Sequence, residues 1–391
     1  NTAPVAFGAL GTPVITLAQV HGYDLMEVTA MIGRQLPFFS LLVPFWLIWA
    51  FAGRKAMWEI WPAILVTGVS FAIPQFLVSN YIGPELVDII AAIVSMASLI
   101  AFLRVWQPKK IWTSPSMRGH DPSAAEAKPA QPVVRYSRAQ LINAWMPWLI
   151  LSVFVFVWGL PSVKAVLNGI FAPAFPMDGL HNLIEKMPPV VPNPTKEGAV
   201  YTLNLLSATG TGILLSALIS ALVMRYSPAA IVGTFFRTVW LVRYSLLTIV
   251  LMLALGTLTR YSGTDTTLGL AFANTGVLYP FFGTLMGWLG VALTGSDTAS
   301  NVLFGGMQKV AAEQLGLSPN LMGAANSSGG VMGKMIDAQS IVVASTATRW
   351  FDHEGDILRY VFFHSIALAC LVGLLVSLQA YVWPFTSMVI R

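Results

Sequence analysis

Three clusters of hydroxyl, amide and carboxylate side chains interrupt an otherwise apolar chain. They occupy residues 260–267 (RYSGTDTT), 294–301 (TGSDTASN) and 326–337 (NSSGGVMGKMID). Glycine accompanies the polar residues in each cluster, so backbone N–H groups can approach a ligand closely. Serine and threonine hydroxyls both donate and accept hydrogen bonds, which suits a small hydroxylated carboxylate. The clusters therefore predict a binding site for a small polar anion.

The charged side chains of these clusters fall into two roles. Lys334 and Arg260 are the cations best placed to attract a carboxylate. Asp297 and Asp265 are the carboxylates best placed to carry a proton through an apolar layer, because an ionisable group in such a stretch is a functional candidate by default. The predicted ligands of the anion are Ser296, Thr298, Asn301, Asn326, Ser327, Ser328, Lys334 and Arg260.

Each charged candidate also has a structural alternative. Asp297 could cap the N-terminus of a helix. Arg260 and Asp265 could simply pair with each other near an interface. Lys334 could reach the membrane surface or be neutralised by Asp337. The sequence leaves these alternatives open, and we favour a functional role for Asp297 and, by a smaller margin, for Lys334.

The composition restricts the class of protein that can hold these clusters. The chain has 391 residues, of which 56% are hydrophobic and 10% charged, against roughly 25% charged residues in soluble domains. One cysteine and five scattered histidines predict neither a disulfide framework nor a metal site, and the sequence has no nucleotide-binding or hydrolase motif. We expect no cofactor and no nucleic-acid partner. The chain is predicted to be a polytopic membrane protein.

Seven apolar runs approach the length of about 20 residues that a spanning helix needs. They lack the period-two alternation of membrane β-strands, so we expect an all-α protein. The runs are 36–52, 61–78, 86–103, 144–160, 203–224, 240–258 and 361–382.

The distribution of basic residues predicts the orientation of these spans. Arg54 and Lys55 join the first two, and seven lysines or arginines lie in 104–138. The opposite side receives 79–85, which has no basic residue, and 161–201, which has three lysines. Basic loops favour the cytoplasmic side, so 104–138 is predicted to lie there.

The regular spans stop after residue 258. Residues 261–333 contain 14 of the 32 glycines and only four charged side chains. Irregular backbone at membrane depth persists only where it is buried in protein or lines a cavity. Discontinuous helices of this kind surround the substrate in secondary transporters. A second broken segment at 1–13 predicts an inverted repeat.

These features divide the chain into six parts. We expect the missing helices of the first half to precede Asn1, and the glycine-rich packing face at 283–290 is compatible with a homodimer. The parts are 1–35, a broken or re-entrant segment of the first half; 36–104, three spanning helices; 105–140, a cytoplasmic linker; 141–260, three spanning helices with an external loop at 161–201; 261–346, a glycine-rich substrate core of discontinuous helices; and 347–391, a loop and the final spanning helix.

Five stretches carry a resemblance to a known family. They are 1–14 (NTAPVAFGALGTPV), 33–37 (GRQLP), 79–86 (SNYIGPEL), 287–301 (GWLGVALTGSDTASN) and 326–340 (NSSGGVMGKMIDAQS). In these stretches, and over nearly its whole length, the chain resembles the bacterial L-lactate permease family, which includes glycolate permeases. The resemblance implies uptake of L-lactate, with D-lactate and glycolate as further substrates, by proton symport across the bacterial inner membrane. It supplies no residue roles.

Combined with the polar clusters, these considerations give one hypothesis for the mechanism. The carboxylate of the substrate faces Lys334 or half-helix N-termini, and Ser296, Thr298 or Asn301 binds its hydroxyl group. Asp297 takes up the coupling proton, since burial favours the neutral form of a carboxyl group. The alternatives are a Na⁺-coupled transporter of another small carboxylate or dicarboxylate and, from other classes, a channel or a membrane enzyme.

Overall fold

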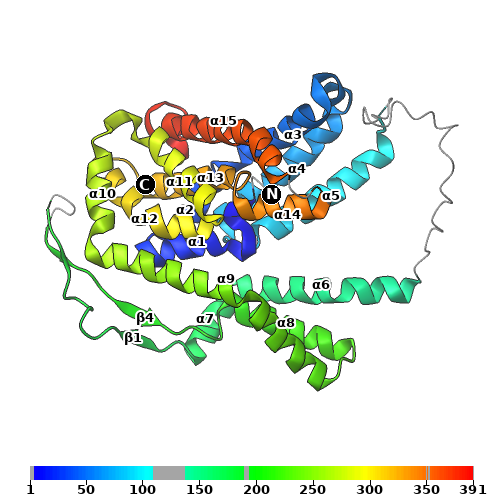
Figure 1. Cartoon of the computed structure of the whole chain (residues 1–391), viewed down its shortest axis with the longest axis horizontal. Coiled ribbons are helices and arrows are strands. Elements are labelled where there is room, and N and C mark those ends of the chain that lie inside the picture. Colours follow the sequence, from blue (N-terminus) through cyan, green and yellow to red (C-terminus); the bar gives the residue numbers. More distant parts are fainter. Residues whose placement is uncertain (1–3, 109–136, 189–192, 349, 351–352, 391) are drawn as a thin grey trace.

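The computed structural model describes residues 4–108, 137–188, 193–348, 350 and 353–390. Its helices form a core, an arm that projects from it and a second layer beneath (Figure 1). Among the described residues, six helical segments are long and apolar enough to cross a membrane. They are Leu25–Glu59, Trp61–Tyr81, Val87–Val105, Arg138–Gly159, Gly276–Thr294 and Glu354–Tyr381.

The core brings together helices from the two ends of the sequence (Figure 1). Helices α1 and α2 contact α12 and α13, and α15 covers α11 and α13. Glycines with left-handed backbone stand at or just after the ends of α1, α11 and α12, with φ of +68°, +71° and +67° at Gly22, Gly295 and Gly316. The core elements are η1 (Val5–Phe7), α1 (Gly8–His21), α2 (Leu25–Ile32), η3 (Gly276–Leu278), α11 (Tyr279–Thr294), α12 (Asp297–Gln314), α13 (Pro319–Gly333), α14 (Ala338–Thr348), α15 (Glu354–Tyr381) and η4 (Phe385–Met388).

Helix α1 is interrupted near its start. Ala9, Leu10 and Gly11 have left-handed φ values of +46°, +62° and +75°. A Cβ atom on Gly11 would lie 2.6 Å from Cβ of Pro84, so only glycine fits this contact. The break therefore seats the opening segment directly on the 79–86 stretch, which is far away in the sequence.

The contacts between α1 and α12 occur in the same order along the two helices. The Asn301 side chain donates to the carbonyl oxygen of Pro13 at 3.2 Å, and Lys309 Nζ donates to that of His21 at 3.2 Å. The two helices thus run in the same direction. The inverted repeat stays a prediction.

Glycine at three positions of α11 allows this helix to pack closely against α12 and α13. Cβ atoms built on Gly283, Gly287 and Gly290 would lie 2.7, 2.0 and 2.3 Å from atoms of Met322, Asn326 and Ser300. The prediction that these glycines form a helix-packing face is confirmed. Because this face is buried inside the chain, it is not available to a second copy.

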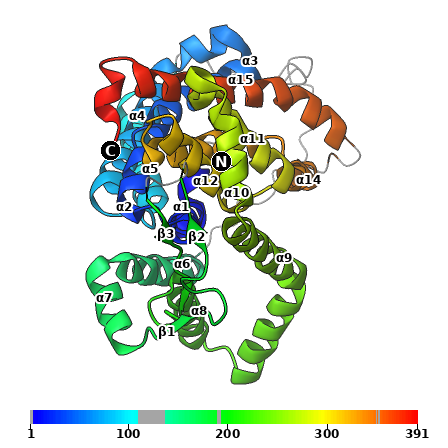
Figure 2. The ribbon, with the colours of Figure 1, turned by 90° about the vertical axis from the view of Figure 1, so that its left-hand side faces the viewer.

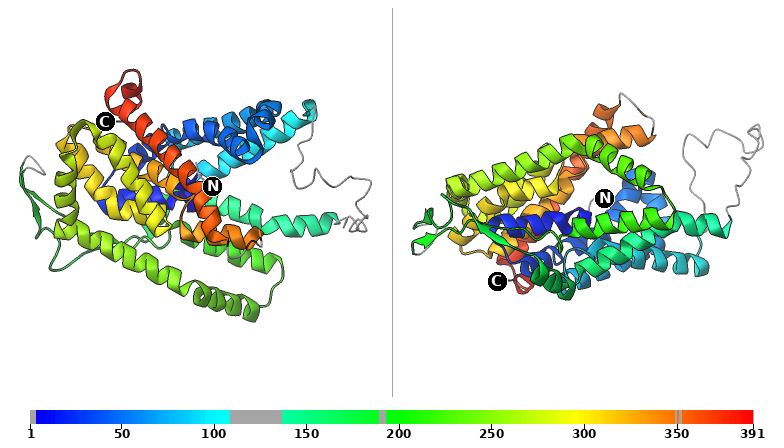
Figure 3. Two further views of the ribbon diagram at one scale, coloured as in Figure 1. Left: turned by 45° about the horizontal axis from the view of Figure 1, so that its top comes forward. Right: turned by 90° about the horizontal axis from the view of Figure 1, so that it is seen from below.

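Three long helices form the projecting arm, drawn in blue to cyan (Figure 3). They are α3 (Leu36–Glu59), α4 (Trp61–Tyr81) and α5 (Val87–Val105). Proline at the second position starts both α3 and α4, where a missing backbone N–H costs nothing. The three predicted spans from 36 to 103 lie within these helices.

A second layer lies beneath the core (Figure 2). Two short antiparallel strand pairs, β1 with β4 and β2 with β3, occupy the predicted external loop. The layer consists of α6 (Arg138–Gly159), α7 (Pro161–Ile170), β1 (Ala174–Pro176), β2 (Glu185–Lys186), β3 (Thr195–Lys196), β4 (Val200–Thr202), α8 (Thr209–Val223) and α9 (Pro228–Ser262). Helix α10 (Thr264–Ala273) follows α9 and packs on α12 of the core.

Two predicted spans differ from the observed helices of this layer. The run 203–224 forms helix only over the 15 residues of α8, because the stretch before Thr209 makes turns rather than helix. Helix α9 starts at Pro228 instead of residue 240 and extends over 35 residues. Arg237, which precedes the predicted run 240–258, is inside it. One further candidate span, Gly276–Thr294, lies in the region where regular spans were predicted to stop.

Candidate functional site

The second sequence cluster forms the turn between α11 and α12. Gly295 ends α11 in the left-handed conformation, and Ser296 is the N-cap of α12, because its side chain accepts a hydrogen bond from the backbone N–H of Ala299 at 3.3 Å. Asp297 is the first helical residue and is 3% exposed. The alternative that Asp297 caps this helix is therefore wrong, and its carboxyl group is free for other contacts.

The carboxyl group of Asp297 has only one hydrogen-bond partner among the described residues. The hydroxyl of Ser327 donates to Asp297 Oδ2 at 2.6 Å. The other oxygen, Oδ1, is buried without a hydrogen-bond partner and lies where a Cβ on Gly330 would be only 2.4 Å away. No ion pair involves Asp297 in the described part of the chain. A buried carboxylate without a cation is costly, so this environment favours a carboxyl group that holds a proton.

Side-chain amides extend this contact into the core. Asn301 Nδ2 donates to the hydroxyl of Ser327 at 3.3 Å, and Asn326 Nδ2 donates to Asn301 Oδ1 at 2.9 Å. Asn301, Asn326 and Ser327 are each 0% exposed. Asn301 also reaches Pro13 of the interrupted helix α1. The hydrogen bonds thus join three helices, α1, α12 and α13, at one buried point.

Two residues that the sequence clusters did not include continue the same chain of hydrogen bonds. Gln308 Nε2 donates to Asn326 Oδ1 at 3.2 Å, and the hydroxyl of Tyr279 donates to Gln308 Oε1 at 2.7 Å. Both side chains are fully buried. Helical spacing could have revealed Gln308, because Asp297, Asn301 and Gln308 are four and seven residues apart and share one face of α12. We refer to Asp297, Asn301, Gln308, Asn326, Ser327 and Tyr279 as the buried polar cluster.

The other predicted anion ligands surround the buried polar cluster without joining its hydrogen bonds. Ser296 and Thr298 are half-buried at the start of α12. Ser328 follows Ser327 on α13, and its hydroxyl is buried without a partner in the described structure. An unpaired buried hydroxyl is costly, and a bound ligand would relieve that cost.

Lys334 lies at the end of α13, close to the start of α12. Its Nζ donates to the carbonyl oxygen of Gly295 at 2.7 Å and lies 3.2 Å from a carboxylate oxygen of Asp337. The side chain of Lys334 is 18% exposed and that of Asp337 is fully buried. Asp337 therefore neutralises Lys334 in this conformation, as one of the alternatives from the sequence proposed.

Arg260 and Asp265 have backbones in α9 and α10, but their side chains lie outside the part of the chain that the structure describes. Lys309, another of the charged residues in the glycine-rich region, has a structural role. It donates to the carbonyl oxygens of His21 and Gly22 at the C-terminal end of α1, where a cation is favourable.

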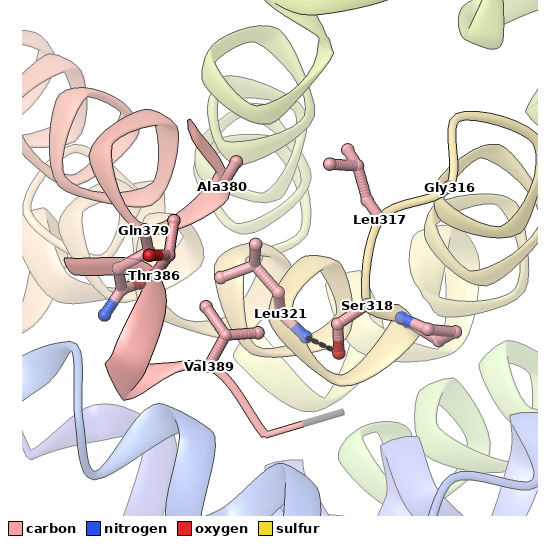
Figure 4. Close-up of a pocket in the computed structure, with 9 residues that line it drawn as sticks. Gly316, Leu317, Ser318, Leu321, Gln379, Ala380, Thr386 and Val389 are labelled. Carbon is pink, nitrogen blue, oxygen red and sulfur yellow. Dashed lines mark hydrogen bonds between the residues drawn. The ribbon is translucent and has the colours of Figure 1, made fainter. Parts of the chain in front are cut away.

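A cavity of about 450 Å³ lies at the N-terminal end of α13, opposite the end where Lys334 lies (Figure 4). Ser318 and Leu321 from the start of α13 face Gln379 of α15 and Thr386 and Val389 of the C-terminal segment (Figure 4). Ten residues, or about 15 Å of helix, separate Ser318 from Ser328. The cavity is thus distinct from the buried polar cluster, whose side chains are closed to solvent in this conformation.

The geometry restricts what the buried polar cluster can do. It offers a carboxyl group without a cation, several amides and hydroxyls, and backbone N–H groups at the start of α12, all at a contact of short helices rich in small residues. Such a site can bind a small polar anion and hold a proton, provided that the helices move to admit the substrate. Together with six candidate spans, this architecture is that of a polytopic membrane protein with a polar core.

Comparisons with known proteins identify the family. The model of the L-lactate permease family matches residues 1–383. The glycolate permease GlcA of Escherichia coli (strain K12) is 46% identical over 402 residues, which cover 100% of this chain and 71% of the relative. The L-lactate permeases of Salmonella typhimurium and Bacillus subtilis (strain 168) are 44% and 43% identical, cover 98% of this chain and are themselves covered to 69% and 70%.

The chain belongs to the L-lactate permease family. It is therefore a multi-pass membrane transporter rather than an enzyme, which confirms the resemblance inferred from the five sequence stretches. The crystal structure of the YdaH transporter of Alcanivorax borkumensis covers 97% of this chain and is itself covered to 83%, at 13% identity and a TM-score of 0.39. A similarity that weak carries no conclusion about the fold.

Proposed function

We propose that this chain is the transport core of a permease that imports L-lactate, and also D-lactate and glycolate, by proton symport across the bacterial inner membrane. The names of its relatives support the substrate class, since they are permeases of L-lactate or glycolate. Both compounds are small 2-hydroxy acids. The observation that carries the proposal is the buried carboxyl group of Asp297, which among the described side chains has no cation partner and a single hydrogen bond, from Ser327.

Asp297 is the proposed proton carrier. When the site faces the outside, the carboxyl group takes up a proton and the substrate anion binds beside it. One proton and one anion then cross together, so that each transport cycle moves no net charge across the membrane. When the site faces the cytoplasm, lactate and the proton leave together.

Asn301 and the serines are the proposed ligands of the substrate. The hydroxyl group of a 2-hydroxy acid needs partners that both donate and accept, which Asn301, Ser296 and Thr298 offer near Asp297. The carboxylate would face the backbone N–H groups at the start of α12 or the ammonium group of Lys334. Asn326 and Ser328 on α13 would complete the site. Because the cluster is closed, its side chains must exchange their mutual hydrogen bonds for hydrogen bonds to the substrate as the helices part.

Two substitutions distinguish a substrate role of Lys334 from a purely structural ion pair. We expect Lys334→Gln to raise KM for L-lactate about tenfold, because one charge-assisted contact to a carboxylate is lost. Asp337→Asn should instead lower KM, about twofold to fivefold, because it releases Lys334 from its partner. Initial uptake rates over a range of lactate concentrations measure both values. If the two variants raise KM alike, Lys334 serves only to hold α13 against α12.

The function is tested by uptake of labelled L-lactate into membrane vesicles that contain the full-length protein. An inside-alkaline pH gradient should drive accumulation, a protonophore should abolish it, and replacement of Na⁺ by choline should leave it unchanged. Loss of uptake in choline would favour the Na⁺-coupled alternative. Saturable counterflow of lactate would exclude a channel, and recovery of unaltered lactate would exclude an enzyme. Absence of lactate uptake in the unaltered protein would contradict the substrate assignment.

A further inference from the structure

A second cavity lies at a bend in α3, far from the buried polar cluster in sequence. Gly53 has φ +82° and ψ 170°, a conformation that leaves the helix, so the last turn of α3 departs from the direction of the preceding span. Residues on both sides of this bend line a cavity of about 470 Å³. Its lining consists of Trp46, Trp49, Trp58, Phe45, Met57 and Arg54, with Leu42 at its inner end.

The walls of this cavity are held in place by contacts with one another and with α15. Trp46 Nε1 donates to His364 Nδ1 at 3.1 Å, and its ring meets that of Trp49 edge to face at 5.5 Å. The hydroxyl of Tyr360 donates to the carbonyl oxygen of Ala50 at 2.9 Å. These contacts fix the wall of the cavity that precedes the bend against α15.

The opening of the cavity combines aromatic surface with a positive charge. Arg54 lies 5.7 Å from the ring centre of Trp49 and forms no ion pair within the described residues. Trp49 and Trp58 remain 38% and 64% exposed. Lys55 is also exposed, and Glu59, the carboxylate of this last turn, does not line the cavity. An amphipathic rim of this kind matches a ligand with an anionic head and an apolar tail.

The position of the bend in the membrane indicates which ligand that is. The bend joins the spans of α3 and α4, on the same side of the arm as Arg104 at the end of α5. Tryptophan is enriched at the level of lipid headgroups, and basic residues at span ends attract acidic lipids of the cytoplasmic leaflet. We infer that this cavity binds one acidic phospholipid, whose phosphate contacts Arg54 and whose acyl chain lies along Trp46, Trp49 and Trp58.

Native mass spectrometry of the detergent-purified full-length protein with added phosphatidylglycerol tests the inference. We expect one phosphatidylglycerol molecule to bind in preference to phosphatidylethanolamine, and Arg54→Gln to weaken that binding about fivefold, as expected for the loss of one cation at the membrane surface. Arg54→Lys should retain most of the binding. The matched control is Arg104→Gln, which removes an exposed cation from the same side of the arm but not from the cavity, and should leave the affinity unchanged.

Brominated phosphatidylglycerol, which quenches tryptophan fluorescence on contact, tests the location in vesicles. It should quench the unaltered protein more strongly than a Trp49→Phe, Trp58→Phe variant, and free phosphate should not compete. Unchanged binding in Arg54→Gln, equal binding of phosphatidylethanolamine, or competition by free phosphate would each overturn the assignment of an acidic lipid.

Discussion

Replacement of Asp297 by asparagine is expected to abolish lactate accumulation while leaving lactate exchange intact. With a pH difference of one unit, a coupling of one proton per lactate supports an accumulation of about tenfold. Asparagine keeps the size of the side chain and can still accept the hydrogen bond from Ser327, but it cannot take up or release a proton. The internal concentration of labelled lactate should therefore only equal the external one.

The matched control for this substitution is Asp178→Asn. Asp178 is an exposed residue near the strands of the second layer, so its loss should leave the accumulation ratio unchanged. Counterflow in the Asp297→Asn variant, measured with unlabelled lactate preloaded in the vesicles, should remain within about threefold of the unaltered protein. If accumulation persists in this variant, the proton is carried elsewhere and Asp297 has a structural role.

Replacement of Gly287 by alanine is expected to have the largest effect on stability. The added Cβ would lie 2.0 Å from the carbonyl oxygen of Asn326 and 2.8 Å from its Cα. Both are backbone atoms, so the clash cannot be relieved by a rotamer change and α11 must move away from α13. Overpacking of this kind costs about 3 kcal/mol, which in a chain of this length lowers Tm by on the order of 4 °C. Because Asn326 belongs to the buried polar cluster, transport should also fall.

Gly233→Ala in α9 provides the control for that measurement. Nothing lies within 4 Å of a Cβ at Gly233, so alanine there should leave Tm unchanged or raise it slightly through its higher helix propensity. Thermal unfolding in detergent, followed by size-exclusion chromatography, compares the two variants. A Tm of Gly287→Ala equal to that of Gly233→Ala would contradict the backbone contact between α11 and α13.

The sequence predicted the structure correctly where a local pattern is compatible with only one kind of element or contact. Apolar runs located the helices α3, α4 and α5, since only a helix satisfies backbone groups in lipid. Glycine spacing in 283–290 correctly predicted a packing face. The same reasoning placed the start of this span at residue 240 instead of Pro228, because it followed the apolar run, while the helix itself continues through Arg237.

The candidate site shows the limit of sequence reasoning more clearly. Asp297, Asn301 and Ser327 were selected because polar residues in an apolar stretch are unusual, and the structure brings all three together. Tyr279 was missed, since a lone tyrosine in a helix is ordinary until its burial is known. Gln308 was missed although its spacing from Asp297 and Asn301 places it on the same face of α12. Lys334 was selected for its charge, but only the fold shows that Asp337 holds that charge.

The sequence by itself determined the class of this protein and its family, and it selected the residues proposed to bind an anion and a proton, because hydrophobicity, residue chemistry and spacing are local properties. Only the tertiary structure decided that Ser296, and not Asp297, caps α12, and that Pro13 meets Asn301 across 288 positions of sequence. Both features depend on which helices pack together. That packing depends on how many side chains from distant segments fit against one another, which no local pattern shows.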